Sequence, residues 1–162
     1  MFINENARYS INELMPLIKE YISAGTDVRL HVSGISMTPI LHDKRDTVVL
    51  SKPDKIKKYD IVLHQRENGQ YIMHRIIKKR GDVLTIAGDF EIEKEYPVYT
   101  DAVIAKVTSF VRNGKSYTPN DFVIRLYSFI WVLIFPFRYM VLNLLNRVRR
   151  VAGNAKNKKK CN

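Results

Sequence analysis

The sequence predicts a mainly β protein, a small antiparallel β-barrel or coiled sheet with a short helix before it and an amphipathic or membrane helix after it. Three observations support this class. Short β-type runs, separated by turn residues, fill residues 27–117. Helical spacing of apolar residues is confined to the two ends of the chain. Hydrophobic residues make up 46% of the 162 residues, so the chain can bury a core.

The first helix is predicted over residues 10–24. Its apolar positions recur at intervals of three and four residues, as expected for one buried helical face. Gly25 supplies a stop after it. The start is open, because Ser10 and Glu13 resemble a capping box whereas Pro16 is favoured in a first turn. The apolar positions are Ile11, Leu14, Leu17, Ile18, Tyr21 and Ile22.

Strands are predicted throughout the middle of the chain. Turns typical of hairpins lie between apolar runs at residues 68–69, 80–82 and 113–114, each containing a glycine. Short strands at this spacing favour a small antiparallel sheet or barrel, and residues 27–118 are therefore assigned to one β domain. The clearest runs are residues 28–32, 47–51, 61–64, 71–77, 83–86 and 102–111.

A second helix is predicted over residues 121–151. It is apolar over most of its circumference, and Pro136 is expected to kink or break it. Residues 152–162 are rich in Gly, Asn and Lys and are expected to be a disordered basic tail. With a helical segment at residues 1–26, the chain divides into four parts, and the β domain is the second of them.

The net charge of +11 is concentrated at the C-terminal end. Residues 125–162 contain nine Lys and Arg and no Asp or Glu, so the rest of the chain is almost neutral. This asymmetry argues against a globally basic nucleic-acid binder and predicts anionic membrane lipid as the partner of the second helix and tail. We expect membrane association that is peripheral, because Arg138 interrupts the apolar run and disfavours a straight span.

The segment over residues 32–41 carries the strongest chemical signal. A strand is expected to end at Val32, Gly34 allows a tight turn, and Pro39 stiffens the residues that follow. Ser36 then lies at a sharply turned strand exit. A nucleophilic serine is presented in this way, with its own backbone N–H available as an oxyanion donor. The alternative interpretation is an ordinary loop.

Residues 34–39, Gly-Ile-Ser-Met-Thr-Pro, resemble the Gly-x-Ser-Met-x-Pro box of type I signal peptidases and the related SOS-repressor-type serine peptidases. Three further elements follow in family order. Residues 59–62 match a Gly-Asp-x-Val box with Tyr in place of Gly, residues 71–77 contain a His-Arg strand, and residues 87–89 read Ala-Gly-Asp. The His-Arg strand is similar to the endoplasmic-reticulum and archaeal branch. The resemblance, over roughly residues 28–107, implies a β fold of the signal-peptidase type.

This resemblance implies that Ser36 is the nucleophile and His74 the general base. A histidine titrates near neutral pH without special burial, so it can replace the lysine base of other branches. The His-containing branch supplies an acid from an Asp pair beyond its Gly-Asp box, and here Lys94 and Glu95 occupy those positions. Asp89 and Glu95 are therefore both candidates for the acid that orients His74, and a simple Ser-His dyad stays open.

The expected function is that of a membrane-associated serine endopeptidase that cleaves leader or signal-type peptides bound in extended form. The main alternative is a catalytically inactive, peptide-binding module of the same fold at the membrane surface, favoured by the missing Asp pair and by Tyr59. A self-cleaving, repressor-like regulator is disfavoured by the histidine base. Specific nucleic-acid binding is not expected.

No cofactor and no metal site are predicted. The single cysteine, Cys161, excludes an intrachain disulfide and a cysteine-built metal centre. The four histidines are scattered along the chain without a pair at metal-binding helical spacing. His31, His42 and His64 are weaker candidates for the base than His74, because none occupies the base position of a matching element.

Overall fold

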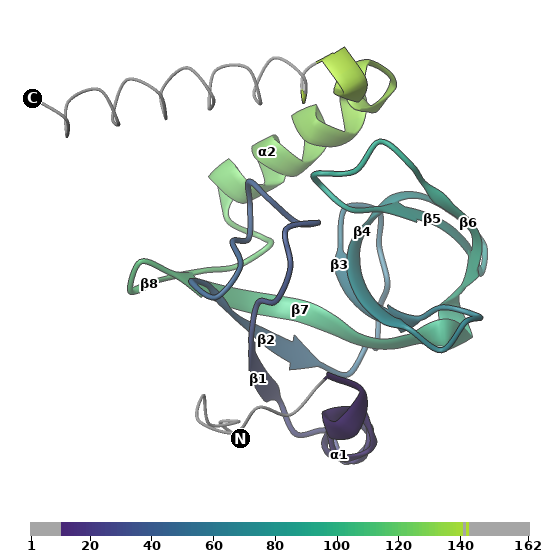
Figure 1. Ribbon diagram of the computed structural model, residues 1–162, viewed down its shortest axis with the longest axis vertical. Helices are drawn as coiled ribbons and strands as arrows, with labels where there is room; N and C mark the ends of the chain where they lie inside the picture. Colours follow the sequence, from purple (N-terminus) through teal and green to yellow (C-terminus); the bar gives the residue numbers. More distant parts are fainter. Residues whose placement is uncertain (1–10, 141, 143–162) are drawn as a thin grey trace, which may run out of the picture.

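The β-type runs pair into one antiparallel sheet, described by a computed structural model for residues 11–140 and 142 (Figure 1). The strand order is β1-β2-β7-β3-β4-β5-β6, and β8 pairs with the C-terminal end of β7. The mainly β, antiparallel prediction is confirmed. The strands are β1 Val28–His31, β2 Thr47–Ser51, β3 Ile61–Gln65, β4 Tyr71–Arg80, β5 Val83–Ala87, β6 Glu95–Tyr99, β7 Val103–Arg112 and β8 Lys115–Tyr117.

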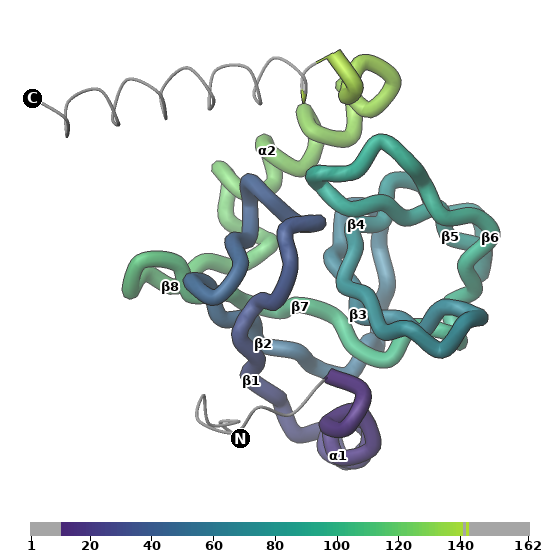
Figure 2. The backbone as a smooth tube through the Cα atoms, viewed as in Figure 1, coloured from purple at the N-terminus to yellow at the C-terminus, as the bar shows by residue number. Residues whose placement is uncertain are grey.

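The sheet is strongly coiled and open. Strands β3 to β6 curl around one another (Figure 2). The two end strands, β1 and β6, do not pair with each other, so the sheet is not a closed barrel and the coiled-sheet alternative is correct. Register shifts interrupt the β2–β7, β3–β7, β4–β5 and β5–β6 pairs. Such irregularities increase local twist and bend a strand, which explains how two ten-residue strands can follow the coil.

Helix α1, Ile11–Ser23, covers the sheet near β1 and β7. Its buried face differs in part from the predicted one: Ile18 and Ile22 are buried as expected, and so is Met15, which was not predicted. Ile11, at the start of the helix, is exposed. Burial of each of the three buried side chains stabilises the fold by about 1.5–3 kcal/mol. A second, smaller core lies inside the curl and contains Val62, Ile76, Leu84, Ile86 and Val103.

The C-terminal helical prediction is only partly realised. Helix α2 spans Phe122–Leu133, and a 3-10 turn, η2, at Phe135–Phe137 interrupts the helix at Pro136. The break follows from the missing N–H of proline and from its ring. Within the described residues there is no helix with both the length and the apolar character needed to cross a membrane. The predicted basic tail and the last part of the predicted helix lie outside the described residues.

Strand β6 was not predicted from the sequence. It contains Pro97, which cannot donate a hydrogen bond to a neighbouring strand. The strand is nevertheless tolerated, because β6 is the last strand of the sheet and pairs on one side only, with β5. This edge strand begins at Glu95, and it therefore decides where one of the candidate acids lies.

Candidate active site

The loop that carries Ser36 is fixed at both ends. Gly34 has a φ of +93°, a conformation that favours glycine, and its N–H donates to Asp43 Oδ1 over 2.8 Å. Met37 and Leu41, which follow Ser36, are buried in the main core. Ser36 itself is half-buried. The loop therefore holds Ser36 between a turn that favours glycine and two buried side chains.

The Ser36 loop rests on the loop between β5 and β6. The backbone N–H of Phe90 donates to the carbonyl oxygen of Ser36 over 2.7 Å. A Cβ at Gly88 would lie 2.7 Å from the same oxygen and 2.9 Å from Cδ of Glu91, closer than real Cβ contacts come. Gly88 is thus required for this close approach, which explains the glycine of the Ala-Gly-Asp element physically.

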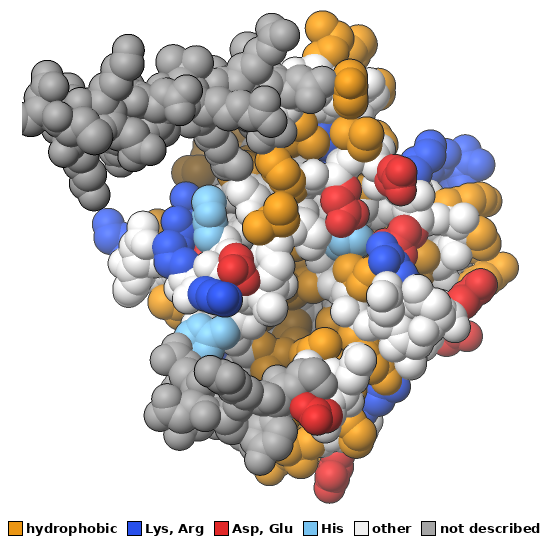
Figure 3. All heavy atoms as spheres, in the orientation of Figure 1, with side chains coloured by type: hydrophobic (Ala, Val, Ile, Leu, Met, Phe, Trp, Pro, Cys, Tyr) orange, Lys and Arg blue, Asp and Glu red, His pale blue; other side chains and the backbone are white. Residues whose placement is uncertain are grey.

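His74 lies on β4 with a carboxylate at each ring nitrogen. Its side chain is 1% exposed, and Nδ1 lies 2.9 Å from Oε1 of Glu95. On the other side of the ring, Nε2 lies 3.4 Å from Oε2 of Glu91. The ring nitrogens make no well-aligned hydrogen bond among the residues described, so these are close contacts that become ion pairs only when the imidazole is protonated. Figure 3 shows acidic side chains gathered beside a histidine on this face.

Glu95 is held in place by Arg66. The guanidinium Nε and Nη2 donate to the two carboxylate oxygens over 2.8 and 2.6 Å, a bidentate pairing. Burial raises the pKa of Glu95, but the Arg66 hydrogen bonds and the charges of His74 and His64 outweigh it and hold this pKa below its usual value. Glu95 is therefore ionised at neutral pH and available to steady the imidazole.

Glu91 was not singled out by the sequence. The contact with His74 is the main reason that the pKa of Glu91 lies below its usual value. Its side chain is 39% exposed and lies close to Gly88. The carbonyl oxygen of Ser36 also lies close to Gly88. Glu91 therefore covers the ring nitrogen that a serine hydroxyl would have to reach.

Ser36 and His74 are not hydrogen-bonded to each other. Neither ring nitrogen of His74 has a hydrogen-bond partner among the described residues. Catalytic hydrogen bonds are often long or absent before substrate binds and form only in the reacting complex. In this protein, rotation of the partly exposed Glu91 side chain would free Nε2 of His74 from its present contact with the carboxylate.

Asp89, the other candidate acid, lies with Arg75 rather than with His74. Arg75 Nε and Nη2 donate to its two oxygens over 2.8 and 2.7 Å, and both side chains are almost fully buried. Tyr127 of α2 also donates to Asp89, over 3.1 Å. Arg75 further donates to Ser128 of α2 over 2.8 Å. Asp89 therefore ties β4, the β5–β6 loop and α2 together.

His64, one of the weaker histidine candidates, lies beside His74 and Glu95. The pairing of β3 with β4 sets Val62 opposite His74 and His64 opposite Ile72, so the two histidines are diagonal neighbours. Their ring centroids are 6.3 Å apart, and Nε2 of His64 lies 3.9 Å from Oε2 of Glu95. Burial is the main reason that the pKa of His64 falls to about 4. The hairpin turn at residues 68–69 is the only sequence signal for this pairing.

Arg138 closes the site from the C-terminal side. It is 1% exposed, and its Nη1 donates to the carbonyls of Gly88 and Glu91 over 2.7 and 3.0 Å. Its Nη2 donates to the carbonyl of Trp131 over 3.2 Å. The sequence predicted Arg138 as an interruption of a membrane-facing run, whereas the structure uses it to cap the β5–β6 loop.

Tyr59 occupies the position where the resembled box has glycine. Its φ is +81°, in the region that favours glycine and that bulky residues rarely adopt. Its carbonyl accepts a hydrogen bond from Arg75 over 3.0 Å, and its ring lies edge-on to Phe129 of α2. Tyr59 thus adopts a backbone conformation that favours glycine, and its ring adds a contact to α2.

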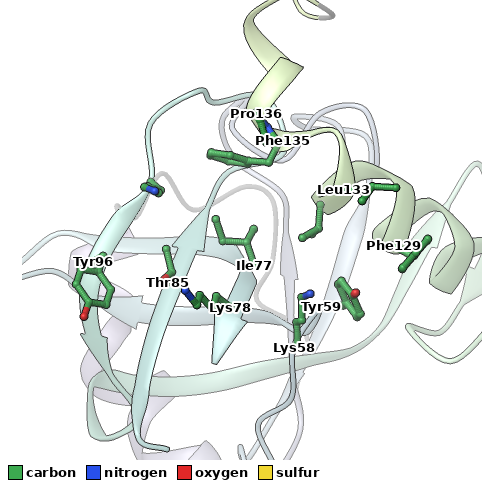
Figure 4. Close-up of a pocket in the computed structure, with 12 residues that line it drawn as sticks. Lys58, Tyr59, Ile77, Lys78, Thr85, Tyr96, Phe129, Leu133, Phe135 and Pro136 are labelled. Carbon is green, nitrogen blue, oxygen red and sulfur yellow. The ribbon is translucent and has the colours of Figure 1, made fainter. Parts of the chain in front are cut away.

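A separate pocket of about 490 Å³ lies between the sheet and the α2–η2 segment (Figure 4). Its walls are mostly apolar, with Tyr59 and Phe129 on one side and Phe135 above. Lys58, Lys78 and Lys94 also line it, so the pocket combines apolar walls with positive charge.

Compared with known proteins, the chain matches no family model and no curated protein sequence. The resemblance to signal peptidases therefore rests on the four sequence elements alone.

Proposed function

We propose that this protein is a membrane-associated serine endopeptidase, resembling signal peptidase I, that cleaves leader or signal-type peptides. The observation that carries the proposal is the contact of His74 Nδ1 with Glu95 Oε1 at 2.9 Å, beside the β5–β6 loop on which the Ser36 loop rests. A nucleophile on a rigid turn and a base oriented by a carboxylate are the two parts that serine peptidase chemistry needs.

In the proposed reaction, Ser36 Oγ attacks the scissile carbonyl while Nε2 of His74 takes the hydroxyl proton. Glu95 keeps the Nδ1 proton in place and stabilises the imidazolium that forms. His74 then returns the proton to the leaving amine, and an acyl-enzyme remains on Ser36. Water hydrolyses the acyl-enzyme through the same base. The backbone N–H of Ser36 is the proposed donor to the oxyanion.

The substrate is proposed to bind in extended form along a sheet edge, where free backbone groups can pair with it. Membrane association is proposed to rest on α2, which packs Ile124, Ser128 and Trp131 inward. Its opposite face is strongly exposed and apolar, as expected of a helix that lies at a lipid interface. That face contains Phe122, Val123, Leu126, Phe129, Ile130 and Leu133.

One observation favours the second candidate, an inactive peptide-binding module at the membrane surface. Glu91 faces Nε2 of His74. This Nε2 has no hydrogen bond to Ser36. If Glu91 stays in this position with substrate bound, the base cannot take the serine proton. The two candidates therefore differ in whether Ser36 reacts.

The test is labelling of the purified protein with a peptidyl phosphonate, followed by mass mapping of the modified residue. We expect labelling at Ser36 and loss of both labelling and peptide cleavage in Ser36→Ala and His74→Ala. Ser33→Ala is the matched control, because Ser33 is an exposed serine of the same loop. Unlabelled wild-type protein that still binds an extended peptide would support the inactive module instead.

A further inference from the structure

The cluster of His64, His74 and Glu95 contains more donor atoms than the proposed peptidase reaction uses. Both histidines are 1% exposed, and none of their four ring nitrogens makes a hydrogen bond among the residues described. One donor atom from each of the three side chains lies within 4.8 Å of the other two. Buried polar atoms without a partner are rare in proteins and call for an explanation.

We propose that His64, His74 and Glu95 form a binding site for a divalent transition metal of the Zn²⁺ class, and that the bound metal reversibly inhibits the protein. The sequence spacing predicts no metal site, but the β3–β4 pairing brings together histidines that are ten positions apart. Two imidazoles and one carboxylate are a common protein ligand set for zinc.

The distances are compatible with a metal after small side-chain movements. Zinc binds nitrogen and carboxylate ligands at about 2.0–2.2 Å, so its ligand atoms lie roughly 3–3.5 Å from one another. The contact of His74 Nδ1 with Glu95 is already 2.9 Å, and that of His64 Nε2 with Glu95 is 3.9 Å. Closing the widest gap of the cluster therefore needs rotation of rings rather than movement of strands.

The surrounding charges also favour a cation. Glu95 and Glu91 contribute two negative charges, and Arg66 contributes one positive charge. The net charge of these groups is therefore negative when both histidines are neutral. Arg66 donates to both Glu95 oxygens and fixes the carboxylate, as partners of metal ligands commonly do. Each carboxylate oxygen has a second lone pair that remains for the metal.

Inhibition follows from the tautomer that a metal would impose on His74, and this part rests on the proposed peptidase function. A neutral imidazole that binds metal through Nδ1 keeps its proton on Nε2. That Nε2 has no lone pair with which to accept the Ser36 proton, and its N–H points to Glu91, 3.4 Å away. Metal binding and general-base catalysis therefore compete for the same ring.

Metal binding is tested without any need for catalysis, in Ser36→Ala protein that also carries Cys161→Ser to remove the only thiol. Titration with Zn²⁺ by calorimetry should show one site, and Co²⁺ should give the visible absorption of a four- or five-coordinate centre. His64→Gln should weaken Zn²⁺ binding at least tenfold. His31→Gln, which removes an exposed histidine, should leave it unchanged.

Two results would overturn the metal site. One is equal Zn²⁺ affinity in the His64→Gln and His31→Gln proteins. The other, which needs no folded His64 variant, is an NMR titration of the Ser36→Ala protein in which Zn²⁺ does not shift the ring resonances of His64 and His74.

Inhibition is tested separately in protein with Ser36 intact. Zn²⁺ should suppress peptide cleavage or phosphonate labelling at the concentration that saturates the site, and a chelator should restore it. His64→Gln should need at least tenfold more Zn²⁺ for the same suppression relative to its own metal-free rate. Binding without any Ser36 reactivity would contradict the peptidase proposal alone. Reactivity that saturating Zn²⁺ leaves unchanged would overturn the inhibitory role alone.

Discussion

At the residue scale, two acids that look equivalent in the sequence have different roles in the structure. Glu95 lies 2.9 Å from His74 and is partly exposed, whereas Asp89 is fully buried against Arg75. A carboxylate beside an imidazole can orient its tautomer, and one buried with a guanidinium holds elements together. The acid position of the proposed triad therefore belongs to Glu95.

Substitution of the two acids should separate activity from stability. Glu95→Gln should lower kcat for peptide cleavage by at least about tenfold with a small change in stability, because orientation of the base is lost. Asp89→Asn should instead lower the free energy of unfolding by about 3–5 kcal/mol, because Arg75 is left as a buried, unpaired charge. Steady-state kinetics and urea unfolding measure the two effects.

Glu93→Gln serves as the control for both, since Glu93 is an exposed acid in the same loop. If Asp89→Asn were stable but inactive while Glu95→Gln kept full activity, the assignment of the acid would be reversed.

His64 should make the fold sensitive to acid. Its pKa in the folded protein is about 4, against a usual value of 6.5, so the folded state favours neutral His64. The unfolded chain takes up the proton as pH falls below about 6.5, and stability is therefore lost between about pH 6.5 and 4, by up to roughly 3 kcal/mol. Urea midpoints across this range should fall less steeply in His64→Gln than in the parent protein. Parallel slopes would show that other groups cause the loss.

At the element scale, the α2–η2 segment is part of the site as well as a candidate membrane contact. Tyr127 and Trp131 donate to the side chain and the backbone of Asp89, over 3.1 and 2.9 Å. Arg138 donates to two carbonyls of the β5–β6 loop. The loop beside His74 is thus held from the C-terminal side as well as by the Ser36 loop.

Removal of the Arg138 head group should therefore loosen the β5–β6 loop. Arg138→Met removes one hydrogen-bond donor from each of the carbonyls of Gly88, Glu91 and Trp131, and we expect a loss of about 3 kcal/mol in unfolding free energy. Amide hydrogen exchange should rise at residues 88–91. Arg125→Met is the control, because Arg125 is an exposed arginine of α2. Equal, small effects of both substitutions would contradict the role of Arg138.

At the scale of the whole molecule, one helix has two faces with different tasks. The inner face of α2 covers the buried Arg75–Asp89 pair, and the outer face presents exposed apolar side chains. A chain truncated after Asp121 would uncover that buried pair, so truncation would disturb the fold as well as membrane binding. Substitutions confined to the outer face are the sharper test.

Polar substitution of the outer face should release the protein from membranes. The triple variant Phe122→Gln, Phe129→Gln, Leu133→Gln removes three side chains that are at least half exposed. Each contributes about 1.5–3 kcal/mol when fully buried in an apolar phase, so vesicle binding should fall by well over tenfold in co-sedimentation with anionic vesicles. Ile11→Gln with Tyr99→Gln, exposed apolar residues of other elements, is the control. Binding that survives the triple variant but is lost in high salt would assign the contact to basic groups instead.

The sequence by itself determined the fold class, most strand positions, the break at Pro136 and the candidate pair Ser36 and His74. These features depend on local patterns: apolar alternation, turn residues and short motifs that are contiguous in the chain. The sequence could not decide whether Asp89 or Glu95 orients His74. Both acids lie in the same short segment, which comprises the β5–β6 loop and the first residue of β6. The sequence also missed His64, Glu91 and Arg138 as neighbours of the site.

Only the tertiary structure decided those points. The pairing of β3 with β4 makes His64 a neighbour of His74. The edge strand β6, which the sequence does not predict because it contains Pro97, places Glu95 beside the His74 ring. Arg138 reaches the β5–β6 loop because the chain turns at Pro136 and packs back. Each of these contacts joins residues that are distant in sequence. Strand register and packing of the whole chain set them, and the local signals, such as the hairpin turn at residues 68–69, do not show which side chains meet.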